Sequence, residues 1–214
     1  MNSEVDRALK RALDLAFAGG ALALSWPAFL ALAAVIKWED GGSALYVQER
    51  VGRFGRPFRL FKFRTMRQRA VDAAGLPITV GDDDRVTRVG RFLRRTRLDE
   101  LPQLLNILRG EMSVVGPRPE VSRYVALYSD EQRAVLEVKP GLTDPATLAF
   151  RGEADVLGAS EDPERTYIEI VMPEKLAMNL EYLRQRDVGS DLSLILQTVL
   201  TLASDELSRE GEES

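Results

Sequence analysis

Two adjacent carboxylates, Asp99 and Glu100, lie in a stretch of the chain that is otherwise rich in arginine. Arg94, Arg95 and Arg97 precede them directly. Acids this close to guanidinium groups either form structural ion pairs or gather with them around an anionic substrate. An ionised carboxylate held beside cations is also the group that attack on a phosphorus centre requires. The pair therefore predicts either a phosphate-handling site or a structural ion-pair cluster.

The residues after this pair repeat leucine at helical spacing, which predicts a helix with Pro102 in its first turn and Gly110 as its stop. Asp99 and Glu100 would then lie at the helix N-terminus, where the partial positive charge and the arginines favour ionised carboxylates. A simpler interpretation is that Asp99 only caps the helix, as aspartate often does. A cap explains neither Glu100 nor the surplus of arginine.

The composition of the chain excludes several kinds of chemistry. Its 214 residues include no cysteine and no histidine, which rules out disulfides, thiol nucleophiles, imidazole bases and the usual zinc sites. The net charge of −4 hides a basic centre, because residues 50–118 hold 16 Lys and Arg against 7 Asp and Glu. This centre predicts a bound anion such as a phosphate, a nucleic acid or a lipid surface, unless it is a solvated face paired with acidic residues elsewhere.

An uncharged, mostly apolar segment covers residues 15–36 and is long enough to span a bilayer as a helix. Pro27 lies in its middle and predicts a kink or break there. Lysine and arginine flank the segment on both sides, so the positive-inside rule places both ends in the cytoplasm. We therefore favour a re-entrant helical hairpin, broken near Pro27, over a straight spanning helix or a secretory signal peptide.

The remaining patterns predict an α+β, mostly α, fold with a compact cytoplasmic domain. Alternating residues on both sides of the turn Arg53–Phe54–Gly55 predict a short β-hairpin. Residues 85–98 predict an amphipathic helix with arginines on one face, which suits a membrane interface or an ordinary surface helix. Residues 72–84 predict a loop, and two amphipathic helices near the C-terminus are expected to close the core. We expect a membrane segment over 1–40, a catalytic domain over 41–204 and an acidic disordered tail over 205–214.

Arg118 lies between two prolines, Pro117 and Pro119. Prolines on both sides restrict the backbone, so the guanidinium would be held in one place and could make a bidentate contact with a phosphate. A plain surface turn is the alternative for an isolated Pro-Arg-Pro sequence.

Three segments, in this order after the apolar segment, resemble the bacterial sugar transferases, which are monotopic phosphoglycosyl transferases. They are QERVGRFGRPFRLFKFRTM (48–66), RTRLDELPQLLNILRGEMSVVGPRPE (95–120) and KPGLT (139–143). Each motif is modest alone, but the ordered set is specific, and the resemblance covers nearly the whole chain.

This resemblance implies an enzyme that transfers a sugar-1-phosphate from a nucleotide diphosphate sugar, such as a UDP-sugar, to undecaprenyl phosphate at the cytoplasmic face of the bacterial inner membrane. Asp99 would be the nucleophile, forming a covalent phosphosugar intermediate and releasing a nucleoside monophosphate. Mg²⁺ would neutralise the phosphates, with Asp99 and Glu100 as its ligands. The basic phosphate-binding positions of the family are matched by Arg64, Arg94 and Arg118.

The chain departs from the family pattern in two places. Pro27 matches the family's helix break, but Trp26 replaces the usual preceding serine and Ser25 lies one residue earlier, where its hydroxyl could satisfy freed carbonyls. Residues 144–147 read Asp-Pro-Ala-Thr where many members have Gly-Trp-Ala-Gln. Together with MPEKLAMNLEYL (172–183), this second departure predicts a different sugar pocket.

Two other classes of protein compete with this interpretation. Basic and aromatic residues interleave over 56–69, as they do in proteins that bind single-stranded nucleic acid. That class leaves the apolar segment and the Asp-Glu pair unexplained, so no nucleic-acid partner is expected. A non-catalytic membrane scaffold is disfavoured because Asp99, Glu100 and Arg118 are all present. The sequence leaves the oligomeric state open, a homodimer included.

Overall fold

The computed structural model describes residues 4–67 and 84–212, so nearly all of the predicted loop over 72–84 lies outside the described residues. Helices predominate and two small sheets accompany them, which confirms the mostly helical α+β class. The α-helices are α1 (Glu4–Asp40), α3 (Arg88–Arg95), α4 (Gln103–Arg109), α5 (Ser122–Val125), α6 (Pro145–Ala149), α7 (Glu153–Gly158), α8 (Pro163–Thr166), α9 (Met172–Gln185) and α10 (Val188–Glu212). The strands are β1 (Leu45–Val51), β2 (Pro57–Phe63), β3 (Ser113–Val115) and β4 (Gly141–Thr143). Short 3₁₀ turns are η1 (Arg53–Gly55), η2 (Leu98–Glu100) and η3 (Gln132–Glu137), and η4 (Tyr167–Val171) is a π-helical turn.

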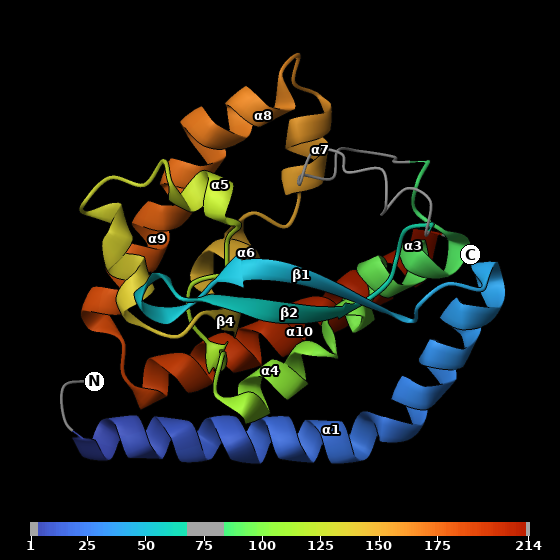
Figure 1. Cartoon of the computed structure of the whole chain (residues 1–214), viewed down its shortest axis with the longest axis horizontal. Helices are drawn as coiled ribbons and strands as arrows, with labels where there is room; N and C mark the ends of the chain where they lie inside the picture. Colours follow the sequence, from blue (N-terminus) through green and yellow to red (C-terminus); the bar gives the residue numbers. More distant parts are fainter. Residues whose placement is uncertain (1–3, 68–83, 213–214) are drawn as a thin grey trace.

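α1 is one helix with Pro27 in its interior. Figure 1 shows α1 bending between two straight segments, so its second part leaves at an angle and does not fold back along the first. Proline causes such bends because it removes a backbone donor and clashes with the preceding turn. The buried Ser25 Oγ has no hydrogen-bond partner among the described residues, so the predicted cap by this hydroxyl is not formed. Residues Glu4–Glu39 are long and apolar enough to cross a membrane, by length and composition alone.

The N-terminal half of α1 is fastened to the rest of the chain by buried polar contacts. Arg11 donates to the carbonyls of Ile107 (2.6 Å) and Leu108 (2.9 Å) at the C-terminal end of α4. Asp14 accepts from the Ser113 hydroxyl and the Val114 amide, both at 3.0 Å. Arg11 thus ties α1 to the C-terminal end of α4, and Asp14 ties it to β3. α1 lies beneath α4 in Figure 1.

β1 and β2 form the predicted antiparallel hairpin, with Leu45 opposite Phe63 and Val51 opposite Pro57. The turn η1 requires two consecutive residues with positive φ, Phe54 at 60° and Gly55 at 73°. The second sheet is a parallel pair of short strands, β3 and β4, which the sequence did not predict. Its strands have only three residues each, too few to show a period.

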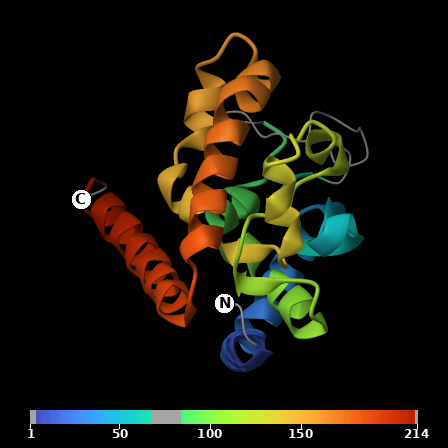
Figure 2. The same cartoon turned by 90° about the vertical axis from the view of Figure 1, so that its left-hand side faces the viewer.

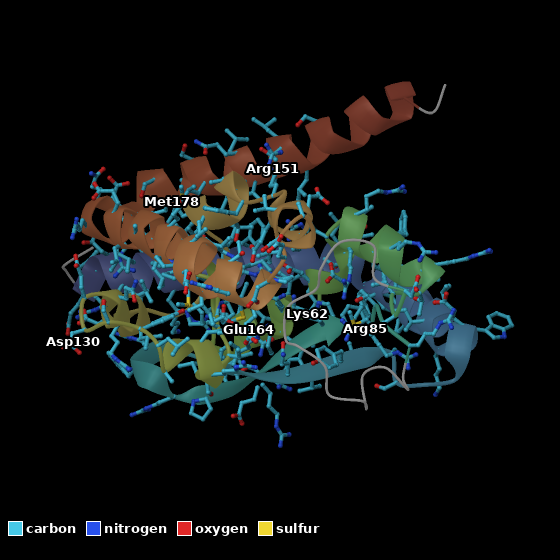
Figure 3. All side chains as sticks on the ribbon, turned by 90° about the horizontal axis from the view of Figure 1, so that it is seen from above. Lys62, Arg85, Asp130, Arg151, Glu164 and Met178 are labelled. Carbon is cyan, nitrogen blue, oxygen red and sulfur yellow. The ribbon has the colours of Figure 1, made fainter. Side chains whose placement is uncertain are left out.

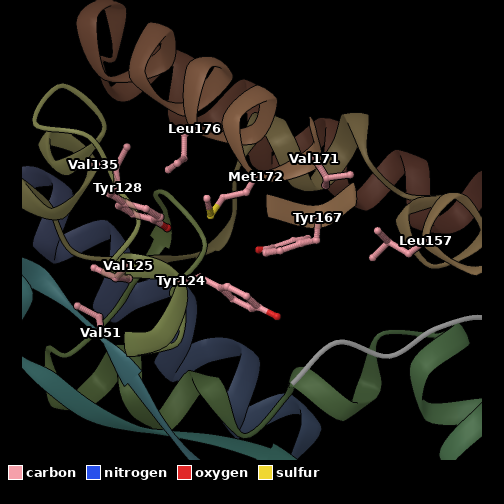
Figure 4. Packing of buried hydrophobic residues seen from close by; sticks show 10 residues of the cluster. All are labelled: Val51, Tyr124, Val125, Tyr128, Val135, Leu157, Tyr167, Val171, Met172 and Leu176. Atoms are coloured by element: carbon pink, nitrogen blue, oxygen red, sulfur yellow. The ribbon is translucent and has the colours of Figure 1, made fainter. Parts of the chain in front are cut away.

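Three clusters of buried apolar residues form the core. One surrounds Ala18 of α1, Ile107 of α4 and Val114 of β3, and apolar residues of α10 pack against it. A smaller one joins α1, β2 and α3. The third lies under α9 and contains three tyrosines, which Figure 4 shows together with Met172 and Leu176. α1 therefore shares a core with the domain that follows it.

The two amphipathic helices predicted near the C-terminus are present as α9 and α10. Figure 2 shows α10 (red) slanting away from α9 (orange) along one side of the molecule. α10 continues to Glu212, which corrects the prediction of a disordered tail from residue 205. Glutamate, leucine and arginine in this stretch are good helix formers, and they extend a helix that is already nucleated.

Candidate active site

The Asp-Glu pair lies in η2, between α3 and α4, and both residues are buried. Arg97 precedes the pair with φ of 57°, and this left-handed residue turns the chain out of α3. Pro102 is the N-cap of α4 and makes no side-chain capping bond, so the interpretation of Asp99 as a simple helix cap is wrong. A buried carboxylate that caps no helix needs another explanation.

Glu100 is fully engaged by two cations. Its carboxylate accepts hydrogen bonds from both terminal nitrogens of Arg118, one of them at 3.4 Å, and forms an ion pair with Lys62 Nζ at 3.2 Å. Burial alone would raise the pKa of Glu100, but Arg118 and Lys62 hold that pKa well below its usual range. The same pairing raises the pKa of Arg118 above its ordinary value, against its burial. Glu100 is therefore a fixed anion.

Asp99 differs from its neighbour in every one of these respects. Its side chain is 8% exposed, and its carboxylate accepts no hydrogen bond from the described part of the chain. Burial, and then repulsion from Glu100, raise the pKa of Asp99 to about 6, while Lys62, Arg118 and Arg94 act in the opposite direction. The expectation that its surroundings favour ionisation is therefore wrong in direction, because burial and the charge of Glu100 outweigh the effect of the neighbouring cations on the pKa of Asp99. Asp99 is left as an uncommitted carboxylate.

The Pro117–Pro119 turn holds Arg118 as predicted. Both prolines are buried, and the Gly141 amide donates to the Pro117 carbonyl at 2.9 Å. A Cβ on Gly116 would lie 2.6 Å from the Lys139 carbonyl oxygen, so glycine is required where β3 leads into this turn. The guanidinium is thus presented to the Asp-Glu pair by a rigid backbone.

Arg94 contacts Thr65, and Arg64 directly precedes Thr65 in the chain. Arg94 Nε donates to the Thr65 hydroxyl at 2.8 Å, and its charge lowers the pKa of Asp99. Arg64 is buried and donates to the Ile36 carbonyl in α1 at 3.4 Å. The structure therefore brings Arg94 and Arg118 toward Asp99, and it gives Arg64 a contact with α1. A phosphate-binding role for Arg64, Arg94 and Arg118 stays a prediction.

Two residues of the site were missed in the sequence. Lys62 lies in β2 and Arg64 directly follows this strand, so period-two spacing along the predicted hairpin could have identified Lys62 as a neighbour of the site. Asp144 is fully buried, caps α6 by accepting from the Thr147 amide at 3.0 Å, and raises the pKa of Arg118. No sequence signal links residue 144 to residue 118, because the parallel β3–β4 pairing joins them.

A polar cavity of about 300 Å³ lies beside Arg118, the partner of Glu100. Arg118 from the Pro117–Pro119 turn and Arg97 from the start of η2 both line it. The rest of its wall includes the tyrosines and apolar residues of the cluster under α9, so that cluster surrounds a hollow. Figure 4 shows the hydroxyl ends of Tyr128 and Tyr167 turned toward each other beneath Met172.

A separate apolar groove of about 290 Å³ includes Glu100 in its wall. Phe17 of α1 and Val199 of α10 line it from the two ends of the chain. The cavity and the groove have three lining residues in common, Arg97, Thr147 and Arg151. Figure 3 labels Lys62 and Arg151, with Arg151 beside α10.

The predicted Mg²⁺ has few protein ligands to draw on. In residues 4–67 and 84–212 no group of three acidic side chains could hold a metal ion. Glu100 already binds Arg118 and Lys62, which leaves Asp99 as the uncommitted donor. This donor set fits Mg²⁺ bound by one or two carboxylates together with substrate phosphates and water, which is the usual coordination of this ion.

A rigid arginine, an uncommitted carboxylate, a polar cavity and an apolar groove define an enzyme that handles a phosphorylated substrate with an apolar part. The family model of the bacterial sugar transferases matches residues 5–205. The chain belongs to this bacterial sugar transferase family.

Similar proteins include two that are named UDP-glucose:undecaprenyl-phosphate glucose-1-phosphate transferase. The one from Caulobacter vibrioides is 41% identical over 196 residues, which are 90% of this chain and 69% of the relative. The one from Escherichia coli is 37% identical over 205 residues, which are 92% of this chain and 40% of the relative. The exopolysaccharide production protein ExoY of Rhizobium meliloti is 36% identical over 204 residues, which are 89% of this chain and 83% of the relative.

Proposed function

We propose that this chain transfers a sugar-1-phosphate from a UDP-sugar to undecaprenyl phosphate in two steps, through a covalent phosphosugar on Asp99. The observation that carries the proposal is the uncommitted Asp99 carboxylate directly beside Glu100, which lines the apolar groove and is bound by Arg118 from the wall of the polar cavity. The names of the relatives supply the two substrates.

In the first step the nucleotide sugar binds in the polar cavity, with its phosphates against Arg118 and Arg94. An Asp99 oxygen attacks the β-phosphorus, and the bond from that phosphorus to the oxygen bridging the α-phosphate breaks. The nucleoside monophosphate leaves with the electron pair. Asp99 must be ionised to attack, and its pKa of about 6 leaves it mostly ionised at neutral pH.

In the second step the polyprenyl phosphate attacks the same phosphorus and displaces the Asp99 carboxylate. The apolar groove between α1 and α10 suits the first isoprene units, and Glu100, the chain neighbour of Asp99, lies in its wall. Because the two substrates would react one after the other through the same Asp99 intermediate, the kinetics should be ping-pong.

Mg²⁺ would be held by the uncommitted Asp99 together with the substrate phosphates and water, and when bound it would neutralise charge between the diphosphate and the carboxylates.

The groove also suggests how the enzyme meets the membrane. The exposed apolar residues of α1 (Leu24, Trp26 and Leu30) and of α10 (Leu196 and Leu200) lie on the two helices that border the groove. We propose that both helices contact the cytoplasmic leaflet of the inner membrane, and that the bend at Pro27 lets α1 enter and return to the same side. Labels at both termini should then be protected from periplasmic reagents in intact cells. Periplasmic labelling of the N-terminus would contradict the re-entrant topology.

The nucleic-acid alternative finds less support in the structure. Phe63 in the basic, aromatic segment is 1% exposed, and the neighbouring Lys62 is paired with Glu100. Neither side chain is presented for stacking on bases or for contact with a phosphate backbone.

The proposal is tested by incubating the purified protein with undecaprenyl phosphate, Mg²⁺ and a panel of UDP-sugars, and by measuring the release of uridine monophosphate. We expect release with at least one sugar, and none from Asp99→Asn. Release at the same rate from both proteins would contradict the assignment of Asp99.

A further inference from the structure

Asn179 is a buried polar residue on the wall of the polar cavity, and the two steps above do not use it. Its side chain is 4% exposed. Met172, Lys175 and Leu176 line the same cavity from α9, at distances of seven, four and three residues from Asn179. These spacings place Asn179 on the face of α9 that faces the cavity. Figure 4 shows Met172 and Leu176 pointing down from this helix.

The Oδ1 of Asn179 has no hydrogen-bond partner in the described part of the chain. An unpaired buried acceptor is costly, and native proteins have few of them. An apolar side chain would fit this wall beside Met172 and Leu176 without that cost. The asparagine therefore has a use other than packing.

The polar groups beside Asn179 already have partners of their own. Lys175 Nζ is paired with Glu153 at 2.7 Å, and the Tyr167 hydroxyl donates to Glu120. Because the nearest cation on α9 is paired with a carboxylate, this wall is poorly suited to a phosphate. A phosphate would also present only acceptor oxygens to the Asn179 carbonyl oxygen, and the two would repel.

We propose that Asn179 is a specificity-determining residue, whose Oδ1 accepts a hydrogen bond from a neutral N–H or O–H group of the nucleotide sugar. The inference rests on the proposed function, because it takes the polar cavity as the site of the donor substrate. Two parts of that substrate offer such a group, the imide N–H of the uracil base and the hydroxyl or amide groups of the sugar.

The test compares the full-length wild type with Asn179→Leu, which keeps a similar volume and removes the acceptor. Met178→Ala is the matched control, because Met178 is 39% exposed on the same helix and does not line the cavity. The loss of one neutral hydrogen bond predicts a KM for the nucleotide sugar that is about two- to twelvefold higher in Asn179→Leu. Met178→Ala should keep the wild-type value.

Thermal unfolding separates recognition from a structural role. Removing an unpaired buried acceptor should leave the Tm of Asn179→Leu equal to or above that of the wild type. A lower Tm with an unchanged KM would mean that the residue is structural, and it would overturn the inference. A wild type that releases no nucleoside monophosphate with any donor would overturn the proposed function, and the inference with it.

Inhibition by uridine monophosphate then identifies the group that is recognised. This product carries the base and lacks the sugar. A larger inhibition constant in Asn179→Leu, together with the raised KM, supports contact with the base. An unchanged inhibition constant with a raised KM supports contact with the sugar.

Discussion

The polar cavity and the apolar groove share Arg97, Thr147 and Arg151 but are otherwise built from different parts of the chain. The wall of the cavity comes mainly from the middle of the chain and from α9, and Arg118 in this wall is fixed by a turn between two prolines. The groove is closed by α1 and α10, the first and last helices. Changes in one wall should therefore affect one half of the reaction and spare the other.

The same division applies to the two acids. Glu100 is bound to Arg118 and Lys62, whereas Asp99 is left uncommitted with a raised pKa. A structural ion pair explains the burial of Glu100 but does not explain the burial of Asp99. The contrast teaches that adjacent carboxylates can divide positioning and chemistry between them.

The largest effect is expected at Asp99, which both half-reactions would require. Asp99→Asn keeps the shape of the side chain but is a very poor nucleophile, so both half-reactions should be lost. We expect turnover to fall by more than about 10⁴-fold, as for other nucleophile deletions. Release of nucleoside monophosphate without acceptor should vanish as well. If only the transfer to the acceptor were lost, the donor half-reaction would not require Asp99.

Arg118→Ala should mainly damage the donor half. The lost charge-assisted contact is worth about 1.5–3 kcal/mol, which is about ten- to a hundredfold in kcat/KM for the nucleotide sugar. Arg118→Lys should restore only part of this, because an ammonium cannot make the paired contact that the guanidinium makes with Glu100. Equal activity of the three proteins would remove Arg118 from the site.

Val199→Asp should damage the acceptor half alone. Val199 lines the groove and is 54% exposed, so the change places a charge in the groove without disrupting the core. We expect the KM for undecaprenyl phosphate in detergent to rise about fivefold or more, with an unchanged burst of nucleoside monophosphate. Gln197→Asp is the control, since residue 197 is exposed on the same helix outside the groove. An equal effect of both substitutions would indicate a general charge effect instead of a groove contact.

The last effect concerns stability instead of turnover. The pKa of Asp99 rises from 3.8 to about 6 on folding, so between these pH values the folded state binds more protons than the unfolded state. Stability is therefore lost as pH rises through this window, and Asp99→Asn avoids that loss. At pH 7 the variant should be more stable than the wild type by about 1–3 kcal/mol, and at pH 4 the difference should be smaller. Denaturant unfolding at the two pH values measures both. A variant that is less stable at pH 7 would contradict the raised pKa.

Local patterns predicted the elements of the fold better than they predicted the contacts of the site. Alternation predicted the hairpin, leucine spacing predicted α4, and the prolines beside Arg118 predicted a rigid turn. The pairing of Glu100 with Lys62 joins residues 38 positions apart, and the parallel contact that brings Asp144 toward Arg118 links two very short strands. These contacts depend on tertiary packing, which local periodicity does not encode. The raised pKa of Asp99 was missed for the same reason, since charge counts along the chain do not show how deeply a carboxylate is buried.

Intact-mass analysis of the wild type after one incubation with its UDP-sugar, without undecaprenyl phosphate, tests the role of Asp99 most directly. A covalent phosphosugar on Asp99 predicts a mass increase equal to one sugar phosphate, one equivalent of uridine monophosphate per enzyme, and loss of both in Asp99→Asn. Later addition of undecaprenyl phosphate should remove the added mass. Unmodified protein under conditions that support turnover, with intersecting instead of parallel double-reciprocal lines, would contradict the covalent route and leave Asp99 as a base or a metal ligand.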